Sequence, residues 1–277
     1  MFRARRCRRS WYQIFALLCF TSLSAFAQQD PVITAANETV TAPSQLRQVA
    51  PPEATLTATE LELRADALRM QKAYADALDY YRAALRKQET SALHNKAGIV
   101  QLQMLRHNSA KKSFQRAIKL DKDNAEARNN LGVVYYIQQN YGRAVKEYKK
   151  AIALNSDSAS FYNNLGTAEY SRKEYQKASD AYMKALEIDA DVFERRSNAG
   201  IQMHMASPAD RAGYHYTIAK MYAAKGDAER CLLYLRKAME EGYSEISKVY
   251  KENEFSAVRK DPRFTALMEQ KPLAIPQ

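Results

Sequence analysis

Small and aromatic residues recur along the middle of the chain with a period of 34 residues. The period appears when the segments that begin at Ala92, Glu126 and Ser160 are aligned without gaps. Four columns then fall into one register: Gly98, Gly132 and Gly166; Ala110, Ala144 and Ala178; Phe114, Tyr148 and Tyr182; and Ala117, Ala151 and Ala185. Self-similarity at such a period indicates a repeat architecture. The low content of glycine and proline, 8 of each in 277 residues, favours helices.

The residue types in these columns predict how the repeats pack. A single helix pair cannot bury its apolar face alone, so neighbouring pairs stack, and small residues allow them to approach closely. Glycine in a helix costs about 1 kcal/mol relative to alanine, so we expect Gly132 and Gly166 to lie where another backbone approaches. Leucine at Ala144 or Ala178 should overpack the crossing. Cys231 falls in the same column and is expected to be a buried small residue without a redox role.

The succession of Leu-Gly, tyrosine, alanine, aromatic and alanine resembles the tetratricopeptide repeat (TPR) family. An earlier copy and a later copy extend the match: Ala65, Ala77, Tyr81 and Ala84; and Ala219, Tyr222, Gly226, Cys231 and Ala238. Two family features are replaced, the tryptophan of the first helix by His94, Arg128 and Tyr162, and the proline after the second helix by Lys122, Ser156 and Ala190. The resemblance implies an all-α fold, a right-handed superhelical solenoid of about five helix-turn-helix repeats.

The spacing also predicts the domain organisation. Ala178 and Cys231 are 53 residues apart, which breaks the period between the fourth and fifth repeats. We therefore expect repeats 1 to 4 at 58–189, a helical insert at 190–211, repeat 5 at 212–242, and a C-terminal cap and tail at 243–277. The insert should contain a helix over 192–205, and Ser207-Pro208-Ala209-Asp210 is typical of a helix start. The cap should cover the last repeat with Phe255, Val258, Phe264, Leu267 and Met268.

Residues 1–27 have the three parts of a secretory signal peptide. Arginines precede an apolar run from Trp11 to about Ser24, and Ala25-Phe26-Ala27 follows it. We expect Sec-type export to the periplasm or beyond and cleavage after Ala27. An uncleaved anchor is the alternative, although the run is shorter than the roughly 20 residues of a membrane span. Residues 28–57, rich in Thr, Ala, Gln and Pro, should form a flexible linker. After cleavage only Cys231 remains, which excludes an internal disulfide.

The net charge of +11 does not by itself indicate a nucleic-acid partner. Five arginines of the N-terminal segment supply almost half of it, and +6 remains without them. Five lysines of the predicted second helices alternate with acids, which favours a solvated surface over a basic stripe: Lys111, Lys112, Lys146, Lys149 and Lys150. The alternative function is binding of an acidic glycan or cell-wall polymer through the basic surface, which would depend strongly on salt.

Motifs for catalysis or metal binding are absent from the sequence. No phosphate loop, nucleophile elbow, zinc motif or Rossmann turn occurs, and His94, His107, His204 and His215 do not have the spacing of metal ligands. Met203, His204 and Met205 are of the types that bind copper, but alternating helical residues point to different sides, which favours packing. We expect no enzyme activity, no cofactor and no metal.

Function should therefore lie on the surface of the array. The TPR resemblance implies a concave groove lined by the first helices, and it places ten residues there: Asn95, Asn129, Asn130, Asn163, Asn164, Ile99, Val133, Thr167, Tyr136 and Tyr170. Amides both donate and accept hydrogen bonds, as an extended peptide backbone requires, and tyrosines add rigid contact area. The Asn-Asn-Leu-Gly stretches resemble the asparagine ladder in the TPR region of O-linked N-acetylglucosamine transferase. Alternatively, Asn130 and Asn164 bond within the array.

These observations predict a non-enzymatic scaffold or adaptor of the cell envelope or secreted space. It would bind an extended segment of a partner protein in the concave groove. A chaperone tail is disfavoured as the partner, because Lys96 has no basic counterpart two repeats on.

Overall fold

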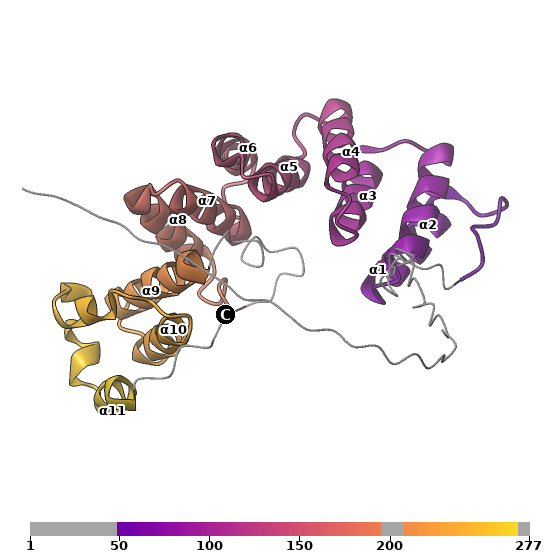
Figure 1. Ribbon diagram of the computed structural model, residues 1–277. Helices are drawn as coiled ribbons and strands as arrows, with labels where there is room; N and C mark the ends of the chain where they lie inside the picture. The colour runs from indigo at the N-terminus through magenta and orange to yellow at the C-terminus, as the bar shows by residue number, and fades with distance from the viewer. Residues whose placement is uncertain (1–48, 195–207, 271–277) are drawn as a thin grey trace, which may run out of the picture. The chain divides into compact units, whose positions relative to one another are not determined.

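The computed structural model describes residues 49–194 and 208–270, which form helices and turns with no strand. Ten helices form five consecutive pairs: α1 (Ala58–Met70) and α2 (Tyr74–Lys87), α3 (Ser91–Gln103) and α4 (His107–Leu120), α5 (Ala125–Ile137) and α6 (Tyr141–Leu154), α7 (Ala159–Ser171) and α8 (Tyr175–Ile188), α9 (Pro208–Ala224) and α10 (Ala228–Glu240). Each pair packs internally, and α2, α4 and α6 also contact the first helix of the next pair (Figure 1). The all-α solenoid predicted from the period is thus confirmed for this part of the chain.

Several sequence-based expectations fall outside the described residues. These are the signal peptide at 1–27, the linker up to residue 48, residues 195–205 of the predicted insert helix with Met203, His204 and Met205, and the tail from residue 271. Residues 190–194 form turns after α8, and α9 begins at Pro208, within the tetrapeptide typical of a helix start.

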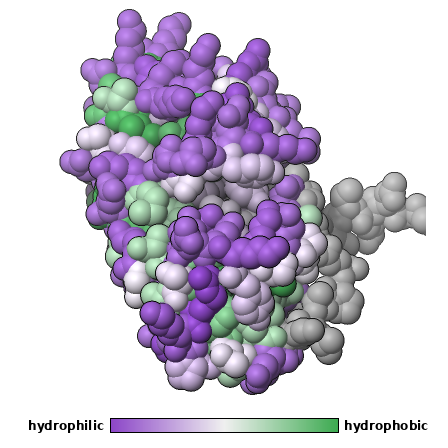
Figure 2. Space-filling model, turned by 90° about the vertical axis from the view of Figure 1, so that its left-hand side faces the viewer, coloured by the Kyte–Doolittle hydropathy of each residue, from purple (hydrophilic) through white to green (hydrophobic). Residues whose placement is uncertain are grey.

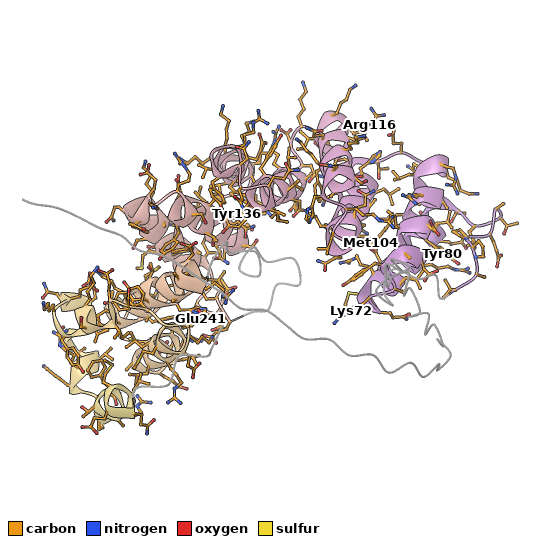
Figure 3. All side chains as sticks on the ribbon, viewed as in Figure 1. Lys72, Tyr80, Met104, Arg116, Tyr136 and Glu241 are labelled. Carbon is orange, nitrogen blue, oxygen red and sulfur yellow. The ribbon has the colours of Figure 1, made fainter. Side chains whose placement is uncertain are left out.

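The turn between the two helices of each pair contains a residue with a positive φ angle. Lys72, Leu105, Gln139 and Lys173 have φ between 57° and 63°, and Gly226 has the equivalent place in the fifth pair with φ of 78°. In the first turn, the amide of Ala73 donates to the carbonyl of Leu68 at 2.9 Å. This left-handed residue after the helix produces the 6→1 bond of a Schellman motif. Figure 3 labels Lys72 and Met104 at the ends of α1 and α3, where two of these turns lie.

Side-chain caps fix the starts of the first helices. Thr57 and Glu60 form a capping box at α1: the Thr57 hydroxyl accepts from the Glu60 amide at 3.2 Å, and the Thr57 amide donates to the Glu60 carboxylate at 2.8 Å. Thr90 and Asn124 accept from the amides of Leu93 and Ala127 at the starts of α3 and α5. Each cap satisfies a helical amide that would otherwise lack a partner.

The glycine that recurs in three repeats has a different cause from the one expected. A Cβ built on Gly98, Gly132 or Gly166 would lie 2.5 Å from the ring of Phe114, Tyr148 or Tyr182, respectively. The close neighbour is therefore an aromatic side chain of the second helix in the same pair, and the expectation of a close backbone approach is wrong. The alanine column is as predicted, since Ala144, Ala178 and Cys231 are fully buried.

Both ends of the described array are covered. Residues 49–56, which belong to the predicted flexible linker, are held on α2: Tyr80 donates to the carbonyl of Ala50 at 3.3 Å and Lys87 to that of Ala54 at 2.7 Å. After α10 come three short 3₁₀ helices (Ile246–Tyr250, Asn253–Ser256 and Val258–Lys260) and α11 (Pro262–Gln270). Four of the five residues predicted to cover the last repeat are buried in its core, and Met268 packs against them: Phe255, Val258, Phe264 and Leu267.

Candidate partner-binding face

Four asparagines of the first helices are joined in one hydrogen-bonded chain, which we call the amide ladder: Asn95, Asn129, Asn130 and Asn164. The Nδ2 of Asn130 donates to Oδ1 of Asn95, and the Nδ2 of Asn164 donates to Oδ1 of Asn129, both at 2.9 Å. A longer contact of 3.4 Å, from Nδ2 of Asn129 to Oδ1 of Asn130, joins the two bonds. The ladder connects α3, α5 and α7, so Asn130 and Asn164 do bond within the array, the alternative left open by the sequence.

The ten residues predicted for the groove differ in exposure. Four are buried and serve the packing of the array: Asn129, Val133, Tyr136 and Thr167, at 8, 4, 1 and 1% exposed. Six remain partly exposed on α3, α5 and α7: Asn95, Ile99, Asn130, Asn163, Asn164 and Tyr170. Of the ten, only these six can contact a partner without a change in the packing of the array. We call the side of the first helices that carries them the ladder face.

The ladder ends at the fourth repeat. Asn163 has the same place in α7 as Asn95 and Asn129 in their helices, yet its buried Oδ1 has no donor among the described residues. The reason is the next repeat, which carries Thr217 where Asn130 and Asn164 lie in the preceding ones. The Thr217 hydroxyl donates to the carbonyl of Gly213 in its own helix at 2.9 Å. The joint between repeats 4 and 5 therefore lacks the amide bond that joins repeat 2 to repeat 3 and repeat 3 to repeat 4.

Tyrosines form a second surface beside the ladder, at the turns of repeats 3 and 4. Tyr136 packs on Tyr141 and Tyr170 on Tyr175, with ring centroids 5.2 Å apart in each pair. Tyr243, which follows α10, stacks on Tyr216 at 4.4 Å. We call Tyr141, Tyr170, Tyr175 and Tyr243 the tyrosine patch. Sequence reasoning missed three of these, although Tyr141 and Tyr175 share the 34-residue spacing and each follows a predicted groove tyrosine by five residues.

Carboxylates lie close to these rings. Burial is the main cause that raises the pKa of Tyr170, and the neighbouring Tyr175 and Tyr243 and the carboxylates of Asp210 and Glu245 add to it. Burial also raises the pKa of Tyr136 to about 12, with further contributions from Tyr141 and Asp210. Carboxylates from the start of α9 and from the turn after α10 are thus near the tyrosine patch, and one of them, Glu245, is paired with Lys248 at 2.8 Å.

Sequence comparison now decides the family. Family models described as TPR repeat or tetratricopeptide repeat match residues 58–92, 106–139, 134–170 and 159–191. This is a tetratricopeptide-repeat protein. The matches cover repeats 1, 3 and 4 and the second helix of repeat 2, whereas most of α3, with Asn95, lies between two of them. No curated protein matches the sequence at a significant level.

Solved TPR structures are similar to this protein at low sequence identity. A crystal structure of MamA has 23% identity and covers 66% of this chain and 96% of its own, with a TM-score of 0.45. MamA 41-end from Desulfovibrio magneticus RS-1 has 19% identity, coverage of 71% and 99%, and a TM-score of 0.48. YrrB, described as a TPR protein with an unusual peptide-binding site, has 19% identity, coverage of 70% and 91%, and a TM-score of 0.45. At this identity the similarity concerns the fold.

Four of the six lysines considered from the sequence have a carboxylate or an aromatic ring as a partner. Lys96 binds Glu62 at 2.7 Å and Asp66 at 2.6 Å, which occupies it between two repeats. Of the five lysines on the second helices, Lys150 binds Glu147 at 2.7 Å, Lys149 binds Glu169 at 3.7 Å, and Lys111 lies 5.0 Å from the centre of the Tyr135 ring. This pairing does not favour a basic stripe for a polymer.

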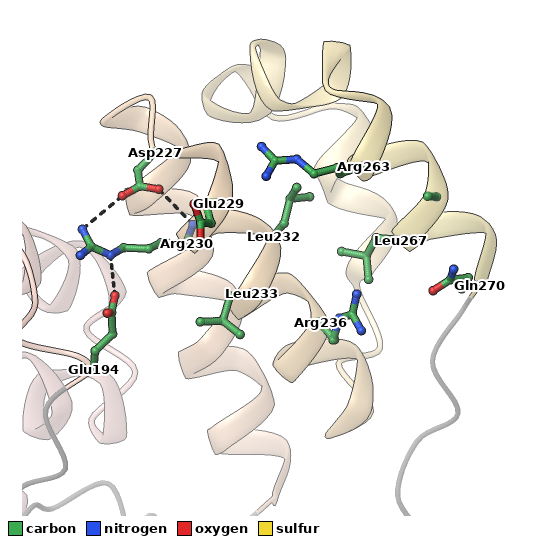
Figure 4. A pocket seen from close by; sticks show the side chains of 11 residues that line it. Glu194, Asp227, Glu229, Arg230, Leu232, Leu233, Arg236, Arg263, Leu267 and Gln270 are labelled. Carbon is green, nitrogen blue, oxygen red and sulfur yellow. Dashed lines mark hydrogen bonds and ion pairs between the residues drawn. The ribbon is translucent and has the colours of Figure 1, made fainter.

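The surface near the C-terminal helices carries a pocket of about 920 Å³ between α10 and α11. Its apolar floor includes Leu232, Leu233 and Leu267, and Arg230 at its edge binds Glu194 at 2.5 Å and Asp227 at 3.2 Å (Figure 4). Figure 2 shows the molecule from this end, where hydrophilic side chains cover most of the surface and hydrophobic ones form small separate patches.

The described residues also offer no arrangement typical of a metal centre, since no three His, Cys, Asp or Glu side chains in 49–194 and 208–270 group suitably. Over the same ranges, no helix is both long and apolar enough to cross a membrane. Burial raises the pKa of the Cys231 thiol to about 12, which makes a reactive thiolate unfavourable.

Proposed function

We propose that this TPR protein is a non-enzymatic adaptor of the cell envelope or secreted space that binds an extended segment of a partner protein along the ladder face. The observation that carries the proposal is the set of partly exposed amides, Asn95, Asn130, Asn163 and Asn164, aligned on three successive first helices. Each amide can form more than one hydrogen bond, so the ladder bonds leave capacity for a peptide backbone. TPR arrays bind protein or peptide partners, which agrees with this use.

The hydrogen bonds within the ladder support binding by a prearranged surface. Asn130 and Asn164 are held by their neighbours in α3 and α5, so less side-chain entropy is lost when a partner binds. Ile99 and Tyr170 on the same face add apolar and aromatic contact area. A segment that follows the ladder would thus bind through its backbone and would gain selectivity from the side chains that flank it.

Two further features support the non-catalytic and exported parts of the proposal. Two of the side chains that could serve chemistry have structural surroundings: His215 lies 2.8 Å from the Glu241 carboxylate, and the Cys231 thiol is buried. Residues 1–27 have the composition of a signal peptide. N-terminal sequencing of protein recovered from the envelope fraction should start at Gln28; a start at Met1 would contradict cleavage after Ala27.

Site-specific photo-crosslinking tests the adaptor function. The photoreactive residue p-benzoylphenylalanine replaces Ile99 on the ladder face or, as the matched control, exposed Ser109 on α4. In cells, Ile99 should capture a distinct protein that Ser109 does not capture. Equal capture from both positions would contradict binding at the ladder face. Capture of no protein, together with salt-sensitive retention on an acidic polysaccharide, would favour the glycan-binding alternative.

A further inference from the structure

The positive charge of this protein is concentrated in two repeats. Residues 107–154, from the start of α4 to the end of α6, contain ten lysines and arginines and four acids. They therefore carry the whole net charge of +6 that remains without residues 1–27, and the rest of the chain after residue 27 is neutral in sum. Helix α4 has no acid at all, so the alternation of lysines with acids expected from the sequence holds only for α6, which contains Glu147.

Four cations of this region have no carboxylate partner among the described residues, and we call them the basic patch: Lys111, Lys112, Arg143 and Lys146. Three of them are exposed, and Lys111 is partly exposed. The acid of α6 is already occupied, because Glu147 binds Lys150 at 2.7 Å and Arg128 at 3.7 Å. The patch is thus open to an anion from outside the chain.

The other acids of the region lie at the far ends of these helices. Asp121 and Asp123 follow the end of α4, and Glu126 is in the first turn of α5. Because a helix rises 1.5 Å per residue, Glu126 lies about 13 Å along α5 from Tyr135, the residue on which the patch centres. Their charge does not offset the patch locally.

The Tyr135 ring holds two cations of the patch together between repeats 2 and 3. The Lys111 ammonium lies 5.0 Å from the centre of the ring, and the carbon of the Arg143 guanidinium lies 5.8 Å from it. These distances place the two cations within about 11 Å of each other, although they come from α4 and α6. One short acidic stretch can therefore contact both.

The next joint of the array shows the charge that is missing at this one. Between repeats 3 and 4, Glu169 has the place of Tyr135, 34 residues further along the chain. Its buried carboxylate binds Arg172 at 2.7 Å and Lys149 at 3.7 Å. The joint between repeats 2 and 3 also presents cations, but a neutral ring replaces the carboxylate. A carboxylate from another molecule would supply there the charge that Glu169 supplies in the next joint.

The fold does not require the lysines of the patch. Lys112 and Lys146 have equivalent places in repeats 2 and 3, and the same place holds Asp79 in repeat 1 and Asp180 in repeat 4. The position therefore accepts either charge. Two adjacent lysines with acids in the repeats on both sides form a bounded patch, which fits a short acidic segment better than a long polyanion.

We propose that the basic patch binds an acidic segment of a second protein, with one of its carboxylates between Lys111 and Arg143 beside the Tyr135 ring. Arginine binds a carboxylate through two parallel hydrogen bonds, and lysine adds a point charge. TPR arrays bind protein or peptide partners, which favours a protein over a charged polymer. The patch includes none of the six residues of the ladder face. The inference therefore goes beyond the adaptor function, because the protein would hold one partner at the ladder and another at the patch.

Two matched peptides test the patch. One is a capped twelve-residue peptide in which glutamate alternates with alanine, and its twin has glutamine in place of glutamate. Fluorescence anisotropy with the purified protein at low salt should show about 10-fold tighter binding of the glutamate peptide, because several individually weak ion pairs form together. Equal binding of the two peptides, or binding of neither, overturns the proposal. Binding of inorganic polyphosphate without a preference for the glutamate peptide overturns it as well.

Substitutions that copy other repeats locate the effect. Lys112→Asp combined with Lys146→Asp introduces the residue of repeats 1 and 4 and should remove the preference for the glutamate peptide. The control combines Lys225→Asp with Lys251→Asp, two exposed lysines outside 107–154, and changes the net charge equally. Loss of the preference in both double variants would reveal an effect of the overall charge and contradict the patch.

Tyr135→Glu tests the place of the first carboxylate. It copies Glu169 and puts a carboxylate of the chain itself beside Lys111 and Arg143, so it should weaken binding of the glutamate peptide about 3-fold or more. Tyr135→Gln has the same shape without the charge and should retain the binding, and circular dichroism checks that both variants keep their helices. Equal binding by the two variants would overturn the assignment of these cations. Crosslinking from Ile99 reports on the ladder face independently of these variants.

Discussion

The joint between repeats 3 and 4 and the joint between repeats 4 and 5 hold similar helix pairs together with different chemistry. The first joint is polar in part: Asn164 donates to Asn129 at 2.9 Å, and Tyr136 meets Ser171 at 2.9 Å. The second joint has neither contact. Its core is aromatic, with the Phe193 ring 5.7 Å from Tyr182, 6.5 Å from Tyr214 and 6.3 Å from Tyr222.

This difference shows what the break in the period adds. Residues 190–194, between α8 and α9, supply Phe193 and two carbonyl acceptors for buried tyrosines: Tyr222 donates to Ala190 at 3.1 Å and Tyr234 to Phe193 at 2.9 Å. Arg230 binds Glu194 from the same turn at 2.5 Å. Where the repeat spacing is regular, small residues and amides join the repeats; where it is not, a wedge of residues from the connecting segment does so.

Removal of the Phe193 ring from this wedge should have the largest effect on the free energy of unfolding. Phe193→Ala should destabilise the protein by about 3–5 kcal/mol, because Phe193 is only 6% exposed and three tyrosine rings would lose their neighbour. In hydrogen exchange the loss of protection should centre on α9 and α10. Phe161→Ala is the matched control, a buried ring of α7 in a different cluster, and it should expose α5 to α7 instead. Identical exchange patterns for both variants would contradict separate joints.

Substitutions in the alanine column test the buried small residue that the regular repeats share. Ala144→Leu or Ala178→Leu should lower the free energy of unfolding by on the order of 1–3 kcal/mol, because both positions are fully buried and extra methyl groups must displace their neighbours. Urea unfolding followed by circular dichroism measures the change. The exposed Ala153 on α6 is the control, and Ala153→Leu should have little effect. Comparable losses at both kinds of position would refute the register.

The helices and the small-residue columns could be predicted from sequence because they depend on spacing. The glycine column shows the limit of such reasoning: spacing identified Gly132, but only coordinates show that the Tyr148 ring, not a backbone, excludes a side chain there. Likewise, Asn129 and Asn130 were predicted to face a partner, whereas their exposure and bonding depend on the distance between successive repeats. Contacts between repeats depend on how closely the helices of successive repeats pack. The periodic pattern of a single sequence does not show that distance.

Exchanging the polar residues of the two joints sharpens the comparison further. Asn164→Thr copies the arrangement of repeat 5 into repeat 4 and should cost about 1–3 kcal/mol, because Asn129 Oδ1 loses its donor at a nearly buried site. Thr217→Asn is the reverse exchange and should stabilise by about 0.5–1.5 kcal/mol. At the equivalent place Asn130 and Asn164 donate to the preceding repeat, and the Oδ1 of Asn163 lacks a donor among the described residues. Differential scanning calorimetry measures both shifts. A destabilising Thr217→Asn would show that the second joint has no room for the ladder.

The smallest effect should come from the pH dependence of repeat 5, where His215 of α9 meets Glu241 after α10. Burial lowers the pKa of His215, and the neighbouring Lys237 and Arg211 act in the same direction, although Glu241 opposes them. The unfolded chain, with an ordinary histidine pKa near 6.5, then binds more protons than the folded one. The free energy of unfolding should therefore decrease as the pH falls below about 6.5, by at most about 1.4 kcal/mol per pH unit for one proton.

His215→Gln should flatten this dependence between pH 8 and pH 5, measured by urea unfolding at each pH. Acidic pairs elsewhere titrate in a lower window: Arg116 and His94 lower the pKa of Glu89 to about 2, so the stability from that pairing is lost only as the pH falls from about 4.5 towards 2. The two windows do not overlap, which makes the histidine effect measurable despite its size. Stability that rises in the wild type on acidification from pH 8 to pH 5 would show that Glu241 outweighs burial, and the charged histidine would then hold α9 to α10.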